Sequence, residues 1–225
     1  MPLIKQAVLA AALGLVLAVA ARAQVDVPTT YGDAMRWYAE AAEAGDAEAQ
    51  FFLGLIYEEG LNDLPRNLAK AAEWYRKAAR QGHVMAQFKL AVLYEHGEGG
   101  SQDLAEAVRW YQSAAENGLA EAQYNLGHMY ELGRGVPRNP VWAANWYRQA
   151  AEQGLAVAQY NLGLLYLWGS GVERDEVAGY MWLEIAAARG HADAALARGR
   201  LAGRMSADAL AQARELARQR MATGD

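Results

Sequence analysis

The stretch AQYNLGHMYELGRGVPRNPVWAANWYRQAAEQG, from Ala122 to Gly154, decides the fold because much of the chain repeats it. Its opening Ala-Gln-aromatic motif recurs in four copies, and its tryptophan and final glycine recur at intervals of 37, 36, 36 and 36 residues. A fixed period of this length is the signature of stacked structural repeats. The recurring tryptophans are Trp37, Trp74, Trp110, Trp146 and Trp182, and the glycines are Gly45, Gly82, Gly118, Gly154 and Gly190.

Each repeat predicts two helices. Ala49, Leu53 and Ile56 stand at i, i+4 and i+7, which is the apolar stripe of an amphipathic helix. Gly54 lies in the same helix, where glycine costs about 1 kcal/mol relative to alanine, so we expect close helix packing there. Residues 133–135 and 169–171 read Gly-x-Gly, a pattern that favours a turn with positive φ. No strand precedes these glycines and no Lys-Ser/Thr pair follows them, so they do not predict a phosphate-binding loop.

The second helix of each repeat begins at a residue that readily caps helices. Good N-cap residues stand seven positions before each recurring tryptophan, and each is worth about 1 kcal/mol over alanine. Pro140 follows one of them, at the first helical position, where its fixed φ fits. The recurring glycine then ends the helix. The predicted caps are Thr30, Asn67, Asp103, Asn139 and Asp175.

These patterns predict an all-α fold, a right-handed α/α solenoid of helical hairpins. The predicted repeats span 46–82, 83–118, 119–154 and 155–190, after an N-terminal partial repeat (24–45) with a helix of the second type. Residues 191–225 predict a degenerate repeat and a C-terminal capping helix, because Arg198 stands where leucine is expected. That last helix follows Ser206, a suitable N-cap, and its expected inner stripe consists of Leu210, Ala213, Leu216 and Ala217.

The N-terminal residues 1–23 have the pattern of a secretory signal peptide. Lys5 precedes an apolar run from Ala7 to Ala21, and small residues stand at Ala21 and Ala23, as a signal peptidase requires. We therefore expect cleavage before Gln24 and a periplasmic or secreted protein, with an uncleaved membrane anchor as the alternative. The chain contains no cysteine, which excludes a lipid anchor on cysteine and disulfide bonds.

Composition excludes several classes of function. The formal net charge is −5, whereas a nucleic-acid-binding protein needs a basic surface. The chain has no Gly-x-Ser-x-Gly motif, no His-Glu-x-x-His motif and no cysteine nucleophile, and it implies no cofactor. His128 and Glu131 have metal-ligand spacing, but one such pair does not define a site. His83 and His191 are predicted to be surface residues at helix starts.

The recurring motifs resemble those of Sel1-like repeats. The shared pattern is Ala-Gln-Tyr-x-Leu-Gly-x-x-Tyr, Gly-x-Gly-Val, then Asp or Asn, and finally Trp-Tyr-x-x-Ala-Ala-x-x-Gly, from about Thr30 to Gly190. Residues 59–63 and 97–100 depart from the Gly-x-Gly-Val turn. Such repeats resemble tetratricopeptide repeats but are longer than 34 residues. The resemblance implies an adaptor that binds proteins, and in bacteria the exported members are linked to envelope assembly, signalling and host contact.

By analogy with tetratricopeptide repeats, the first helices are expected to line a concave groove. Its rows would be Glu48, Met85, Glu121 and Val157; Phe51, Phe88, Tyr124 and Tyr160; Leu55, Val92, His128 and Leu164; and Glu58, Glu95, Glu131 and Leu167. The aromatic row could equally pack between neighbouring repeats. Because the rows change from acidic to apolar along the chain, we expect a partner with a basic segment and an apolar anchor.

Two tryptophans lie outside the recurring set. Trp142 occupies a position that holds Lys70 and Glu106 in earlier repeats, which suggests exposure to solvent. Trp168 aligns with Glu59, His96 and Leu132. A tryptophan at such a position is a candidate anchor for a protein partner, with local packing as the alternative.

Three functions follow from these expectations. The first is an exported scaffold that binds a protein or peptide, the second is a binder of cell-wall glycan through the aromatic row, and the third is an envelope hydrolase that uses groove carboxylates. A hydrolase would need two carboxylates facing each other about 5–10 Å apart.

Overall fold

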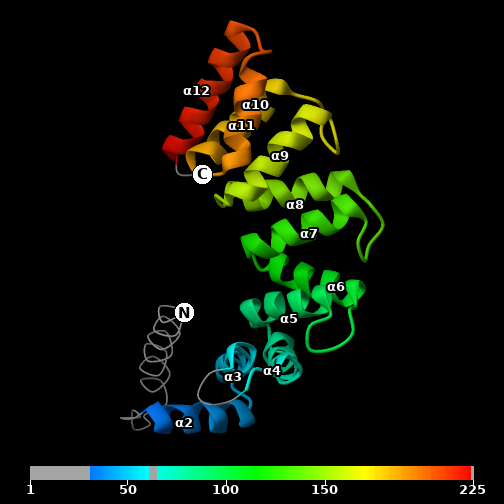
Figure 1. Ribbon diagram of the computed structural model, residues 1–225, viewed down its shortest axis with the longest axis vertical. Helices are drawn as coiled ribbons and strands as arrows, with labels where there is room; N and C mark the ends of the chain where they lie inside the picture. Colours follow the sequence, from blue (N-terminus) through cyan, green and yellow to red (C-terminus); the bar gives the residue numbers. More distant parts are fainter. Residues whose placement is uncertain (1–30, 61–64, 224–225) are drawn as a thin grey trace. The chain divides into compact units, whose positions relative to one another are not determined.

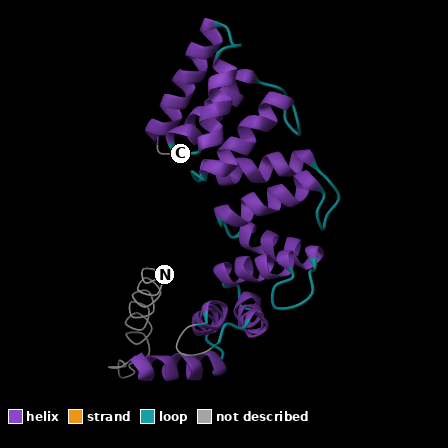
Figure 2. Cartoon of the chain, in the orientation of Figure 1, coloured by secondary structure: helices purple, strands orange, loops and turns teal. Residues whose placement is uncertain are grey.

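The computed structural model describes residues 31–60 and 65–223. The described residues form helices and loops and contain no strand (Figure 2), which confirms the predicted all-α fold. The predicted signal peptide, the expected cap Thr30 and the first seven residues of the predicted partial repeat lie outside the described residues. The helices are α2 (Tyr31–Glu43), α3 (Ala47–Glu59), α4 (Leu68–Arg80), α5 (Val84–His96), α6 (Leu104–Glu116), α7 (Ala120–Leu132), α8 (Pro140–Glu152), α9 (Ala156–Trp168), α10 (Glu176–Ala188), α11 (Ala192–Ala202) and α12 (Ala207–Thr223).

The chain divides into two compact units. Among the described residues, the first unit comprises 31–60, 65–93 and 97–101, with α2, α3, α4 and most of α5. The second unit comprises residues 94–96 and 102–225, with the last turn of α5 and helices α6 to α12. Within each unit, neighbouring helices pair as hairpins: α3 with α4 in the first, and α7 with α8 and α9 with α10 in the second.

The predicted helix starts are confirmed at α4, α6, α8 and α10. The side-chain oxygen of Asn139, for example, accepts a hydrogen bond from the Trp142 amide at 3.1 Å, and Pro140 takes the first helical position. A helix leaves its first amide groups without intrahelical partners, and this bond satisfies one of them. The other three caps that bond in the same way are Asn67, Asp103 and Asp175.

The Gly-x-Gly loops seat each repeat on the one before it. Gly133 and Gly135 both have positive φ, as predicted, and Gly97 and Gly99 adopt nearly the same values although their sequence departs from the pattern. A Cβ added at Gly135 would collide with the backbone carbonyl of Leu104, at the start of the preceding repeat's second helix. Glycine therefore allows both the left-handed backbone and the close approach.

A glycine in the first helix lets the second helix approach. At Gly127 a Cβ would lie only 2.9 Å from Cδ1 of Tyr147, and at Gly54 it would collide with the ring of Tyr75. Both tyrosines are fully buried. The expected close packing is confirmed, and its partner is an aromatic ring.

A buried glutamine joins each hairpin to the helix before it. The amide of Gln159 donates to the carbonyl oxygen of Ala151, eight residues earlier, at 2.9 Å. That carbonyl lies in the last turn of α8, where it also accepts a hydrogen bond from the Gly154 amide at 3.0 Å. Gln50, Gln87 and Gln123 make the same bond to Ala42, Ala79 and Ala115. The recurring Ala-Gln motif was visible in the sequence, but this bond was not predicted.

The C-terminal helix covers the end of the array. Ala217 of α12 is fully buried in a cluster with residues of α8, α9 and α10. Arg220 stacks its guanidinium 4.4 Å from the centre of the Trp182 ring and contacts Glu152 of α8 at 3.3 Å. The Ser206 cap is confirmed, but the place of Leu216 on the inner stripe is wrong, because that side chain is 38% exposed. No helix in the described ranges combines the length and apolarity that a membrane-spanning helix needs.

Candidate functional site

The glutamates expected to line the groove bond to tyrosines of the same hairpin. The Tyr147 hydroxyl donates to Glu131 at 2.6 Å, and the Tyr111 hydroxyl donates to Glu95 at 2.7 Å. Tyr75 donates to Glu58 in the same way. Burial, the hydrogen bond and the nearby carboxylate all raise the pKa of Tyr147 above its ordinary value, so the phenol keeps its proton and acts as the donor.

Cations of the following repeat reach two of these glutamates. Lys89 contacts Glu58 at 3.0 Å, and Arg134 contacts Glu95 at 2.7 Å. Only 19% and 11% of the two glutamate side chains is exposed. Glu48 is likewise paired with His83 at 3.0 Å. The expected attraction of the groove for a basic partner stays a prediction, and the three carboxylates on which it relied already have internal partners.

The last hairpin replaces this polar set with apolar residues. Leu167 stands where the earlier repeats have glutamate, and Leu183 stands where they have tyrosine. Ala197 takes the place that Asn161 holds in the repeat before, where Asn161 bonds to Tyr147. Leu167, Leu183 and Ala197 belong to a single apolar cluster. Such a joint exchange leaves no polar group buried without a partner.

The aromatic row packs between repeats. The ring of Phe51 stacks on His83 with a centroid distance of 4.4 Å, and Tyr160 stacks on His191 at 4.6 Å. His83 and His191 begin their helices as expected, but both are half-buried by these rings instead of lying on the surface. Tyr124 instead lies against His128 and Tyr147 of its own repeat. These contacts support the packing alternative. Phe88, Leu55, Val92 and Leu164 are also partly buried.

Exposed apolar side chains gather at the loop side of the second unit. Trp168 is 66% exposed, Leu132 54%, Val141 54% and Trp142 50%, which confirms the expected exposure of Trp142. The loops after α7 and α9 lie on the same side of this unit (Figure 1). A Cβ at Gly171, three residues after Trp168, would collide with the carbonyl oxygen of Pro140, so the loop after α9 touches the start of α8. We call Leu132, Val141, Trp142 and Trp168 the apolar edge.

Local packing covers only part of the Trp142 side chain. The Trp142 ring stacks on Tyr130 at a centroid distance of 6.1 Å, as Lys70 lies over Tyr57 in an earlier repeat. One face of Trp142 is therefore used within the hairpin, while half of the side chain remains in contact with solvent.

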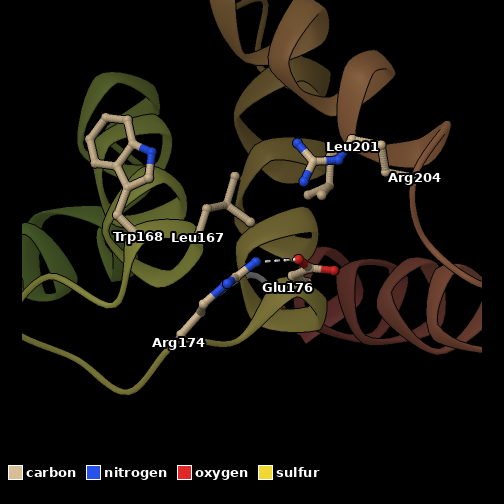
Figure 3. A pocket seen from close by; sticks show the side chains of 6 residues that line it. All are labelled: Leu167, Trp168, Arg174, Glu176, Leu201 and Arg204. Carbon is tan, nitrogen blue, oxygen red and sulfur yellow. Dashed lines mark hydrogen bonds and ion pairs between the residues drawn. The ribbon is translucent and has the colours of Figure 1, made fainter.

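A pocket of about 420 Å³ opens beside Trp168 (Figure 3). Its apolar lining comes from Leu167, Trp168 and Leu201, and its charged lining comes from Arg174, Glu176 and Arg204. The figure shows the Arg174–Glu176 pair, 2.8 Å apart, below Leu167, and the Arg204 side chain above that pair. This volume is in the range of small-ligand and side-chain pockets.

The described residues offer no cluster for a metal. Within residues 31–60 and 65–223, no three His, Asp or Glu side chains come together closely enough to hold an ion. His128 packs against Tyr124, and Glu131 bonds to Tyr147. The pair with metal-ligand spacing is thus held by two different tyrosines.

The sequence profile of the Sel1 repeat matches residues 28–46, 47–83, 84–119, 120–155 and 156–191. A Sel1 repeat protein from Oxalobacter formigenes is 34% identical with a TM-score of 0.73, over 84% of this chain and 79% of that one. The protective antigen c5321 of uropathogenic Escherichia coli, which displays an SLR fold, is 32% identical with a TM-score of 0.57. That match covers 93% of this chain and 52% of the antigen. No curated protein matches the chain.

Proposed function

Because this chain belongs to the Sel1 repeat family, whose members generally mediate protein–protein interactions, we propose that it is a scaffold for a protein or peptide partner. The observation that carries the proposal is the apolar edge, where four large apolar side chains are half or more exposed in one unit. Exposed apolar residues that gather in one place mark interaction surfaces. Tryptophan is also the residue most enriched among interface anchors.

The partner's path follows from helix geometry. Tyr124, His128 and Leu132 stand four residues apart along α7, and Tyr160, Leu164 and Trp168 do so along α9. Residues four apart share one face of a helix, so each of these lines ends at the apolar edge. A helix or extended peptide along the expected groove would therefore reach Leu132 and Trp168 as its anchor points.

The test is to find the partner and then measure how it dissociates. A photo-crosslinking amino acid at Leu132 should capture the partner in the cell, whereas the same group at exposed Glu116 should not. With the captured partner purified, Trp168→Ala should raise its dissociation rate about tenfold or more, because the variant removes an anchor that binding desolvates. Equal crosslinking at Leu132 and Glu116, together with unchanged kinetics of Trp168→Ala, would show that the partner binds elsewhere.

We further propose that the protein is exported. The proposal is supported by Lys5, the apolar run Ala7 to Ala21 and the small residues at Ala21 and Ala23. We expect N-terminal sequencing of the protein from a periplasmic or culture fraction to begin at Gln24. An intact Met1 in the membrane fraction would instead identify the segment as an uncleaved anchor.

A further inference from the structure

We propose that the pocket beside Trp168 binds a peptide segment of the partner in which an apolar side chain is followed by an acidic residue. The inference rests on the proposed scaffold function and adds the chemistry of the bound segment. It depends on the origin of the pocket, on its apolar floor and on one arginine side chain.

The pocket exists because α11, the first helix of the last, degenerate repeat, ends early. Helix α11 has 11 residues, whereas α3, α5, α7 and α9 have 13 each. Gly203 follows α11 at the position that Leu167 occupies in the repeat before. A Cβ at Gly203 would have the carbonyl oxygen of Arg200 as its nearest neighbour, at 3.8 Å. The space above Leu167 is therefore left open.

The floor of the pocket is apolar because the Glu–Tyr pair is absent from the last hairpin. Leu167 contributes the floor in place of a glutamate, and Leu201, 7% exposed, lies beside it. Trp168, which is largely exposed, also contributes to the lining, next to Leu167. An apolar side chain of a peptide would bury these surfaces on binding.

The charges of the pocket favour a carboxylate. Arg174 forms an ion pair with Glu176, which leaves the lining with one cation in excess. The Arg204 side chain is that cation, since it makes no ion pair or hydrogen bond with any residue of the described part of the chain. A guanidinium can bind a carboxylate through two parallel hydrogen bonds, and such charge-assisted bonds are stronger than neutral ones.

The Arg174 side chain also bonds differently from its counterparts in the other repeats. Arg66 and Arg138 donate from Nε to the carbonyl oxygens of Glu58 and Glu131, both at 3.0 Å, and Gln102 makes the same bond to Glu95. Arg174 instead reaches Glu176 at the rim of the pocket. The last hairpin thus differs from the others in the floor and the rim of this pocket, and the shortened helix α11 of the next repeat leaves the pocket open.

The test uses blocked tetrapeptides and fluorine NMR. The full-length protein is labelled with 5-fluorotryptophan, and the Trp168 resonance is assigned from the Trp168→Phe variant. We expect the peptide acetyl-Gly-Leu-Asp-Gly-amide to shift this resonance saturably. The peptides with Asn or Lys in place of Asp should bind about tenfold more weakly or not at all, because they cannot accept the charge-assisted bonds.

A matched pair of arginine variants identifies the group that binds the carboxylate of the peptide. Arg204→Gln should remove the preference for Asp over Asn, whereas Arg109→Gln, whose side chain is 75% exposed on α6, should keep it. The other six tryptophan resonances report whether each variant is folded. No saturable shift with the Asp peptide, or equal affinity for the Asp and Lys peptides, would overturn the inference.

The two proposals can fail separately. If crosslinking at Leu132 and the kinetics of Trp168→Ala succeed while the Asp peptide does not bind, the scaffold function stands and the acidic segment is wrong. If the peptide binds with the expected preference but no partner is captured at Leu132, the preference of the pocket stands and the apolar edge is not the docking surface of the scaffold.

Discussion

Leu126→Ala should lower the free energy of unfolding by about 2–5 kcal/mol, the range for truncating a buried leucine to alanine. Leu126 is fully buried in α7, and it precedes Gly127, where the ring of Tyr147 packs. The truncation removes apolar contacts and leaves a cavity, and the close approach of α7 and α8 limits how far the helices can move to fill it. Urea unfolding followed by circular dichroism measures the change as a shift in midpoint at constant slope.

Glu116→Ala is the matched control in the same unit. Glu116 is exposed at the end of α6 and accepts a hydrogen bond from Gln112 at 2.7 Å. Its loss should cost less than about 0.5 kcal/mol, as is usual for surface substitutions. Equal losses in Leu126→Ala and Glu116→Ala would contradict the assignment of buried and exposed faces.

The Glu131–Tyr147 pair should show strong coupling in a double-mutant cycle. Tyr147→Phe leaves the Glu131 carboxylate without its donor, and Glu131→Met leaves the buried Tyr147 hydroxyl without that acceptor, so each should cost about 1–3 kcal/mol. In the double variant neither group remains. Its cost should therefore be smaller than the sum of the single costs by about 1–3 kcal/mol.

The last hairpin shows why this exchange is tolerated and how it should be made. Leu167 and Leu183 already replace the pair there, but a Cβ at Gly179 would lie 2.5 Å from Cδ2 of Leu167. The repeat with Glu131 has Ala143 at the position of Gly179, so the unbranched methionine is a better substitute than leucine.

The measurement is urea unfolding of the two single variants and the double variant, and Glu116→Ala combined with Tyr147→Phe provides a non-contacting control pair. The control costs should add within about 0.5 kcal/mol. Additive costs for Glu131→Met and Tyr147→Phe would mean that their hydrogen bond does not contribute to stability.

The apolar edge could be predicted from the sequence where one of its residues differs from the residues at the same position in other repeats. Trp142 stands where two earlier repeats have lysine and glutamate, and the structure exposes half of it. The glutamate row was predicted as groove lining by analogy with tetratricopeptide repeats. The structure gives these glutamates another role, since each accepts a hydrogen bond from a tyrosine 16 or 17 residues later in the paired helix.

The period, the two helices of each repeat and the ends of those helices could be predicted from the order of the amino acids. These features depend on interactions within a few residues, such as the bond from Asn139 to the Trp142 amide or the positive φ of Gly135. Which polar side chains bond to one another inside a hairpin follows only from tertiary structure, because Glu131 contacts Tyr147 only when the two helices pair. Tertiary structure also decided where a pocket forms. Arg204 and Arg174 line the same pocket because α11 ends early and the chain turns back there.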